Sequence, residues 1–163
     1  MKFTYLLPIF FVSITVFSQD IARKTLTATR ITDAPKIDGV LDDAVWETLP
    51  TYGDFKMYQP GNEGEVEAAY QSEVKMAYDD KALYFAAYLY DPNPESIMRQ
   101  FSQRDEVFVQ ADGFDIALNT YNDGINETRF FVTSAGTIGD ARVAQNSFDF
   151  GYNVVFECKT SMD

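Results

Sequence analysis

The sequence predicts an all-β fold, an antiparallel β-sandwich of jelly-roll-like form. Several windows alternate apolar and polar residues with a period of two, and no window beyond residue 18 carries a long stripe with helical periodicity. Turn-forming residues recur about every ten residues, which is typical of sandwiches. With 46% hydrophobic and 15% aromatic residues, the chain of 163 residues can build one packed core.

The first part of the predicted sandwich combines short strands with one short helix. Residues 25–32 are rich in β-branched side chains and form the first predicted strand, which turn residues 33–35 close. A helical turn or two is predicted at residues 41–46, with Asp42 as the N-cap. Leu41, Val45 and Trp46 would then face inward. A short strand at residues 55–58 and a polar loop at residues 61–65 complete this part.

The clearest local signal is a hairpin that pairs residues 73–78 with residues 82–90 across an Asp-Asp-Lys turn. Its strands carry apolar or aromatic side chains on both faces, so we expect both faces to be covered. Further strands are predicted around residues 114–118 and, in order, at 128–133, 138–143 and 152–159. Because the chain stops directly after the last of these strands, we expect the sandwich to be incomplete at its C-terminus.

Residues 1–18 have the pattern of a secretory signal peptide. Lys2 precedes an apolar run over residues 6–17, and small or apolar residues, Val16 and Ser18, flank the predicted cleavage site. The run is too short for a permanent membrane span. We therefore expect an exported protein that is periplasmic, outer-membrane-associated or extracellular, with residues 19–163 forming the sandwich.

Charge and composition exclude several classes of function. The chain has 13 Lys and Arg against 25 Asp and Glu, a net charge of -12, so binding that tracks nucleic-acid phosphates is not expected. It has no His, and Cys158 is its one cysteine, which excludes imidazole bases and Cys/His dyads. Glycoside hydrolysis would need two carboxylates facing each other across a cleft, and sequence spacing cannot identify such a pair. We expect this segment to be non-catalytic.

Three blocks, at residues 35–46, 74–85 and 112–116, resemble the family 9 carbohydrate-binding module and occur in that family's order. Residues 117–121 and 130–136 look more like the variant found at the N-terminus of long exported bacterial proteins. In those proteins the module precedes a region that resembles an outer-membrane barrel. The resemblance implies a β-sandwich, a saccharide or polysaccharide as partner, and packing against a downstream domain of the same polypeptide.

The sequence departs from the family pattern at the sugar site. Well-understood family members hold a sugar between two Trp rings, whereas Trp46 is the one Trp here and falls where the family has a core residue. Val109 replaces an expected aromatic residue, with Phe108 one position away. Asp115 matches the position of a sugar-contacting Glu, while an Arg and an Asn of the next strand are replaced. The replacing residues are Phe131 and Thr133.

A saccharide site needs an aromatic face and a few fixed polar groups. We predict Phe108 and Tyr121 as aromatic faces, with Asp115, Asn119 and Arg129 as polar contacts. In the alternative interpretation the two rings pack against the sheet and Asp115 is simply solvated. The resemblance also implies structural calcium, for which Asp91 and Asp112 are the first candidate ligands.

Three hypotheses for function follow. The leading one is an exported, non-catalytic carbohydrate-binding domain of a larger cell-envelope protein, linked to polysaccharide capture or breakdown. The second is a structural cap or plug that packs on a downstream barrel-like domain without binding sugar. The third is an accessory domain of a glycoside hydrolase, in which case the parent protein is a glycosidase.

Overall fold

The computed structural model describes residues 24–59 and 64–162, so the predicted signal peptide at residues 1–18 lies outside the described residues. Strands dominate, and α1 is the one α-helix among the described residues. Short 3₁₀ helices lie at Ala68–Tyr70 and Pro94–Ser96. The other elements are β1 (Thr29–Arg30), α1 (Ala44–Thr48), β2 (Lys56–Met57), β3 (Gly64–Glu65), β4 (Ser72–Tyr78), β5 (Leu83–Leu89), β6 (Gly113–Leu118), β7 (Asn126–Thr133), β8 (Ile138–Ala144) and β9 (Ser147–Asp149).

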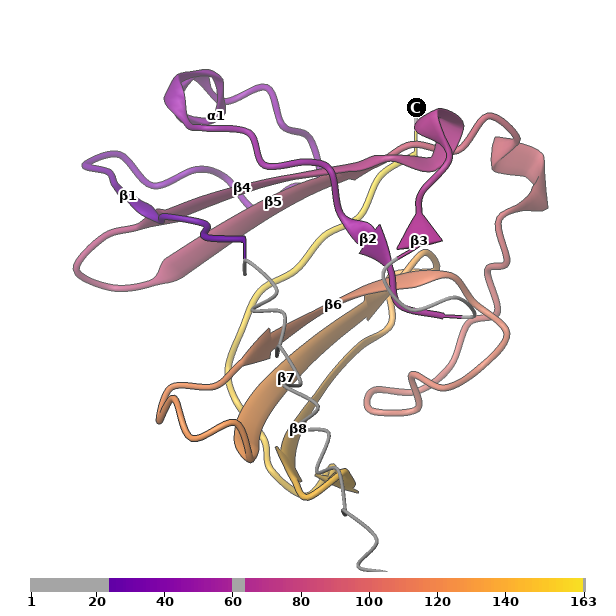
Figure 1. The fold of residues 1–163 in the computed structure, drawn as a ribbon. Helices are drawn as coiled ribbons and strands as arrows, with labels where there is room; N and C mark the ends of the chain where they lie inside the picture. The colour runs from indigo at the N-terminus through magenta and orange to yellow at the C-terminus, as the bar shows by residue number, and fades with distance from the viewer. Residues whose placement is uncertain (1–23, 60–63, 163) are drawn as a thin grey trace, which may run out of the picture.

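Two sheets form the layers of a sandwich (Figure 1). The larger sheet has the order β6-β7-β8-β9, and all its neighbours are antiparallel. The smaller sheet has the order β1-β4-β5, with β1 parallel to β4, while β2 and β3 form a separate antiparallel pair. The prediction of an all-β, mainly antiparallel sandwich is confirmed.

The smaller sheet is covered on one face by α1 and its flanking segments. Trp46 is 3% exposed and packs with Ile31 and Leu49 against Ala77 of β4 and Ala86 of β5. The two alanines let the indole ring lie close to the sheet, where burial of so large an aromatic group is strongly favourable. Trp46 is thus a core residue, as the family resemblance implied.

The helix starts later than predicted. Asp43, not Asp42, occupies the N-cap position, and its Oδ2 accepts the N–H of Lys36 at 3.1 Å rather than capping the helix. Leu41 precedes the first helical turn and is exposed, so its predicted inward position is wrong. Val45 is half-buried against the core, as predicted.

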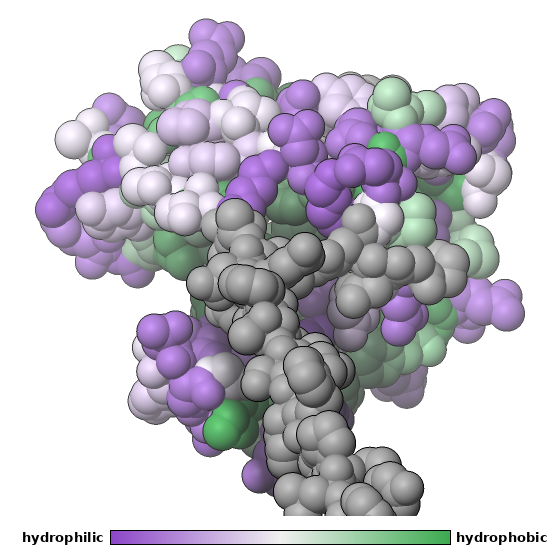
Figure 2. Space-filling view, viewed as in Figure 1, coloured by the Kyte–Doolittle hydropathy of each residue, from purple (hydrophilic) through white to green (hydrophobic). Residues whose placement is uncertain are grey.

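The predicted hairpin is confirmed as β4 and β5. Asp79 closes its turn, since its Oδ1 accepts the N–H groups of Lys81 at 2.7 Å and Ala82 at 2.8 Å. The same bonds, that from Lys81 first, lower the pKa of Asp79. The face away from α1 is only partly covered, because Leu83 and Leu89 on it are exposed. In Figure 2 much of the visible surface is hydrophilic, and hydrophobic residues show below the smaller sheet, which is the upper one in this view.

A second apolar cluster lies on the larger sheet. It consists of Val107, Phe131, Ala141 and Val143, with Phe150 packed against it. Gly139 sits beside this cluster, and a Cβ at that position would lie 2.8 Å from Cγ1 of Val107. The loop that carries Val107 therefore approaches β8 as closely as it does because residue 139 has no side chain.

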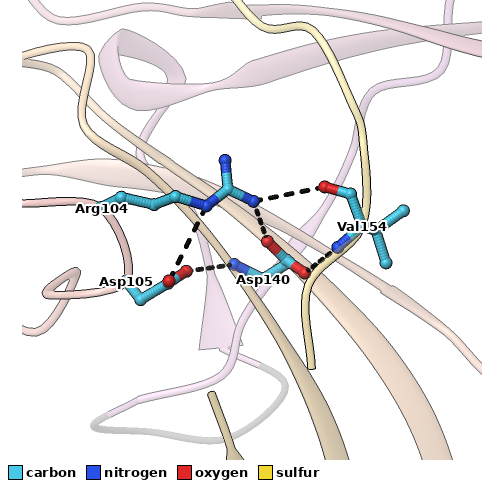
Figure 3. A network of polar contacts seen from close by, with 4 residues as sticks. All are labelled: Arg104, Asp105, Asp140 and Val154. Carbon is cyan, nitrogen blue, oxygen red and sulfur yellow. Dashed lines mark hydrogen bonds and ion pairs between the residues drawn. The ribbon is translucent and has the colours of Figure 1, made fainter. Parts of the chain in front are cut away.

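The predicted strand at residues 152–159 is extended but is not a strand. Its side chains alternate between half-buried and exposed, yet it has no ladder partner among the described residues. Val154 instead bonds to side chains: its N–H donates to Oδ2 of Asp140 at 2.7 Å, and its carbonyl oxygen accepts Nη2 of Arg104 at 3.3 Å (Figure 3). Because two charged side chains occupy the place of a neighbouring strand, the prediction is wrong here.

Asp140 is the centre of this network (Figure 3). Its carboxylate is fully buried, and Oδ1 accepts a hydrogen bond from Nη2 of Arg104. Its backbone N–H donates to Oδ1 of Asp105 at 3.1 Å, and the N–H of Asp105 donates to the carbonyl oxygen of Ile138 at 3.1 Å. The loop containing Arg104 and Asp105 thus crosses the edge of β8, which β9 leaves unpaired beyond Arg142.

Two short elements also differ from prediction. β1 covers only Thr29–Arg30 because it pairs with just the last two residues of β4. Gly64–Glu65, predicted within a polar loop, forms β3 by pairing with β2.

Within the described ranges, 24–59 and 64–162, no helix has the length and apolar character that crossing a membrane requires.

We predict that Asp140→Asn destabilises the fold by about 2–3 kcal/mol, because Arg104 would lose its ion pair with a fully buried carboxylate and keep only the longer pair with Asp105, at 3.7 Å. Urea denaturation of the wild type and the variant measures this difference. The matched control is Asp80→Asn, which removes the exposed ion pair with Arg30. The control should cost less than about 1 kcal/mol. Equal losses for the two variants would contradict a special role for Asp140.

Candidate functional site

Four phenylalanine rings gather on one face of the larger sheet. Phe131 of β7 is buried at the base of the group, and Phe148 of β9 and Phe150 lie beside it. Phe108 comes from the loop before β6 and is 69% exposed. We call these four residues the phenylalanine platform.

Phe108 is held by edge-to-face contacts with the other three rings. Its centroid lies 5.8 Å from that of Phe131, 5.5 Å from Phe148 and 5.9 Å from Phe150, at interplanar angles of 73°, 88° and 81°. Phe148 and Phe150 are nearly parallel, with 12° between their planes. These are favourable aromatic geometries, so the most exposed ring has a defined orientation.

The loop that carries Phe108 is fastened to the sheet at several points. The N–H of Ser102 donates to Oγ1 of Thr137 at 3.3 Å, and this hydroxyl donates to the carbonyl oxygen of Ser102 at 3.2 Å. Arg104 and Asp105 attach the same loop to β8, as described above. The loop that presents Phe108 is thus held by Thr137, by the backbone of β8 and by the buried carboxylate of Asp140.

Polar groups flank the platform. Arg129 of β7 donates from Nε and Nη2 to Oε1 of Glu127, at 3.1 and 2.9 Å, and its Nη1 lies 3.5 Å from Oδ2 of Asp115. Its guanidinium carbon lies 5.6 Å from the ring centroid of Phe148. Asp115 and Arg129 thus belong to the same surface as Phe108. The carboxylates retain lone pairs that can accept further hydrogen bonds.

The structure places the other two predicted contacts elsewhere. Asn119 lies in the loop before β7, where its Oδ1 accepts the N–H of Asp123 at 3.3 Å, and it lines a shallow depression together with Glu127. Tyr121 is 80% exposed and makes no ring contact with any described residue. Of the predicted set, the structure brings together Phe108, Asp115 and Arg129.

Sequence reasoning missed Phe148, Phe150 and Glu127. The first two flank Asp149 and follow a turn at Gln145 and Asn146, which is the pattern of a short strand that starts directly after a hairpin turn. Two phenylalanines spaced two residues apart after such a turn could have marked them. Glu127 gave no signal of its own in an acidic chain.

The calcium prediction gains no support from the side chains. Oδ1 of Asp91 accepts the N–H of Asn93 at 2.7 Å, and Oδ2 of Asp112 accepts the N–H of Met98 at 3.2 Å. Among the residues that the structure describes, no three His, Cys, Asp or Glu side chains are grouped to hold a metal ion. Calcium also binds carbonyl oxygens and water, so its binding at Asp91 or Asp112 stays a prediction.

Cys158 is half-buried, and burial raises the pKa of its thiol. A raised pKa leaves little thiolate near neutral pH, so the thiol is a poor nucleophile. Cys158 is thus better suited to packing as a small apolar residue than to covalent chemistry.

The chain was compared with curated proteins, with solved structures and with models of protein families. Neither the curated proteins nor the solved structures contain a match. The model of one protein family, described as "Carbohydrate family 9 binding domain-like", matches residues 37–155. This range contains α1, both sheets from β4 onward and all four rings of the platform.

We predict that the carboxyl group of Asp123 titrates below the usual range for aspartate. It accepts hydrogen bonds from the backbone and side chain of Asn126 and from the N–H of Ile125, and these lower its pKa. Because the folded loop favours the ionised carboxylate, Asp123 stabilises the fold at every pH above its unfolded-state pKa. This stabilisation is lost as the pH falls through the pKa of the folded state.

Carboxyl-carbon NMR measures this titration directly. Asn126→Ala removes one donor and should raise the pKa of Asp123 towards the value of a free aspartate. A wild-type pKa equal to that of an unstructured peptide would contradict the hydrogen-bonded loop.

Proposed function

Because the chain belongs to the carbohydrate family 9 binding domain-like family, we propose that it binds a saccharide on the phenylalanine platform. The observation that carries this proposal is the exposed, oriented ring of Phe108 beside the polar group of Arg129, Asp115 and Glu127. The domain acts by binding, without catalysis of its own.

The two kinds of group match the two kinds of surface on a sugar ring. A pyranose has a face of C–H groups, which packs on an aromatic ring, and a rim of hydroxyls, which needs fixed donors and acceptors. Phe108 and Phe148 supply the apolar surface. The carboxylate oxygens of Asp115 and Glu127 accept hydroxyl hydrogens, while Arg129 holds both carboxylates in place.

Among the described residues the platform offers the sugar one aromatic face, whereas well-understood members of the family enclose the sugar between two Trp rings. Phe131, which replaces a polar family residue, lies beneath Phe108 rather than across from it. A single aromatic face contacts less of the sugar than a clamp does. We therefore expect weaker binding than a two-sided site would give.

The wider role follows from the sequence. The signal pattern of residues 1–18 supports export, and the family supports a role in polysaccharide capture or breakdown as part of a larger cell-envelope protein.

One observation favours the second hypothesis, a cap that packs on a downstream domain. The face of β4 and β5 away from α1 exposes three large apolar side chains, those of Tyr78, Leu83 and Leu89. This surface is separate from the platform, since it belongs to the other sheet. A packing role there is compatible with saccharide binding on the larger sheet.

We predict that Phe108→Ala lowers saccharide affinity about tenfold or more, because it removes the exposed ring on which the sugar packs. Titration calorimetry against a panel of soluble oligosaccharides measures the loss. Phe101→Ala is the matched control, since Phe101 is 78% exposed, precedes Phe108 in the same loop and makes no ring contact with the platform.

The control should bind as the wild type does. The proposal would be overturned if a folded wild-type chain bound no saccharide, or if the two variants lost affinity equally. Thermal melts of both variants confirm that any loss reflects the site rather than the fold.

A further inference from the structure

A shallow depression lies at one end of the larger sheet, between the loop that enters β7 and the turn that joins β8 to β9. Its volume is about 410 Å³, within the range of small-molecule sites. Four of the residues that line it carry a carboxamide: Asn119, Asn126, Gln145 and Asn146.

The depression is linked to the phenylalanine platform by residues that contact both. Glu127 lines it and also holds Arg129, whose guanidinium lies over the ring of Phe148. Val143 lines it too and is the cross-strand partner of Phe148. The depression therefore adjoins the side of the platform that Phe148 and Arg129 form.

The carboxamides have unused hydrogen-bonding capacity. Asn119 uses its Oδ1 and Asn126 uses its Nδ2 to bind Asp123, while the remaining amide atom of each has no partner among the described residues. The side chains of Gln145 and Asn146 form no hydrogen bond with any described residue. A carboxamide offers a donor and an acceptor side by side, which suits a pair of neighbouring hydroxyls.

The turn at Gln145 and Asn146 fixes two of these groups. Both residues have left-handed backbone conformations, with φ of 49° and 63°. This is the geometry of a two-residue hairpin turn, in which glycine is common and glutamine is not. The left-handed backbone is unfavourable for these two residues, and it places both of them at the depression.

The charge of the depression favours a neutral ligand. Glu127 contributes a carboxylate, and no basic side chain lines the depression. Arg129, the cation that Glu127 binds, is already engaged by Glu127 and Asp115. An acidic or sulfated sugar would meet repulsion here without a compensating partner.

We propose that the depression is a second saccharide subsite, so that the chain selects a neutral oligosaccharide of at least two rings. One ring packs on the platform, and the next places its hydroxyls against the carboxamides. This inference rests on the proposed function, because the platform supplies the first subsite.

The test compares single rings with disaccharides by calorimetry on the full chain. The probes are glucose with maltose and cellobiose, xylose with xylobiose, mannose with mannobiose, and galacturonic acid with its dimer. At least one neutral disaccharide should bind about tenfold tighter than its monosaccharide, the effect of two or three added hydrogen bonds. The galacturonic acid dimer should show no such gain.

The double variant Gln145→Gly/Asn146→Gly should erase the gain and leave monosaccharide affinity unchanged. Glycine accepts the positive φ of the turn, so only the side chains are lost. The control is Asp54→Gly, which makes the same kind of replacement outside the depression, at a residue whose φ is 53°. This variant should keep the tighter binding of the disaccharide.

Three results would overturn the second subsite while the platform stands: no gain from a second ring, a gain that survives in the double variant, or an equal gain for the acidic dimer. A folded chain that binds neither monosaccharides nor disaccharides would instead overturn the proposed function, and this inference with it.

Discussion

A carboxylate removed from solvent must have its oxygens engaged, and for Asp140 two segments of the chain meet that need. Arg104 supplies the counter-charge from the loop before β6, and Val154 supplies an N–H from the segment after β9. The same loop presents Phe108 over the larger sheet. One buried charge thus sets the path of two connecting segments and, through one of them, the surface on which we place the ligand.

Much of the fold could be predicted because every second residue of a half-buried strand faces the core and is therefore apolar. The hairpin of β4 and β5 and the strands β6 to β8 follow the alternation of apolar residues. Residues 152–159 alternate as regularly, yet they form no ladder, because Asp140 and Arg104 bond to Val154 where a strand would lie. Nothing distinguishes Asp140 from the other acidic residues in the sequence. Its burial is a consequence of tertiary contacts that no local pattern records.

The positions of candidate-site residues could be predicted on paired strands, where the register fixes their neighbours, but not in loops. Asp115 and Arg129 lie on adjacent strands and share a face, so they meet as soon as the register is fixed. Tyr121, in a polar loop, has no such constraint, is exposed and makes no contact with any other described ring. Phe148 and Phe150 stand among polar residues, and only the turn before β9 brings them onto the sheet.

The crossing of the β8 edge by Asp105 also bears on self-association. Where β9 ends, β8 would present a carbonyl and an N–H able to pair with a strand of another molecule. Asp105, with φ of 69°, supplies both partners itself, its N–H to Ile138 and its carboxylate to the N–H of Asp140. One residue therefore stands in for a missing strand. The part of β8 that β9 leaves unpaired is thus closed to pairing with a strand of another molecule at Ile138 and Asp140.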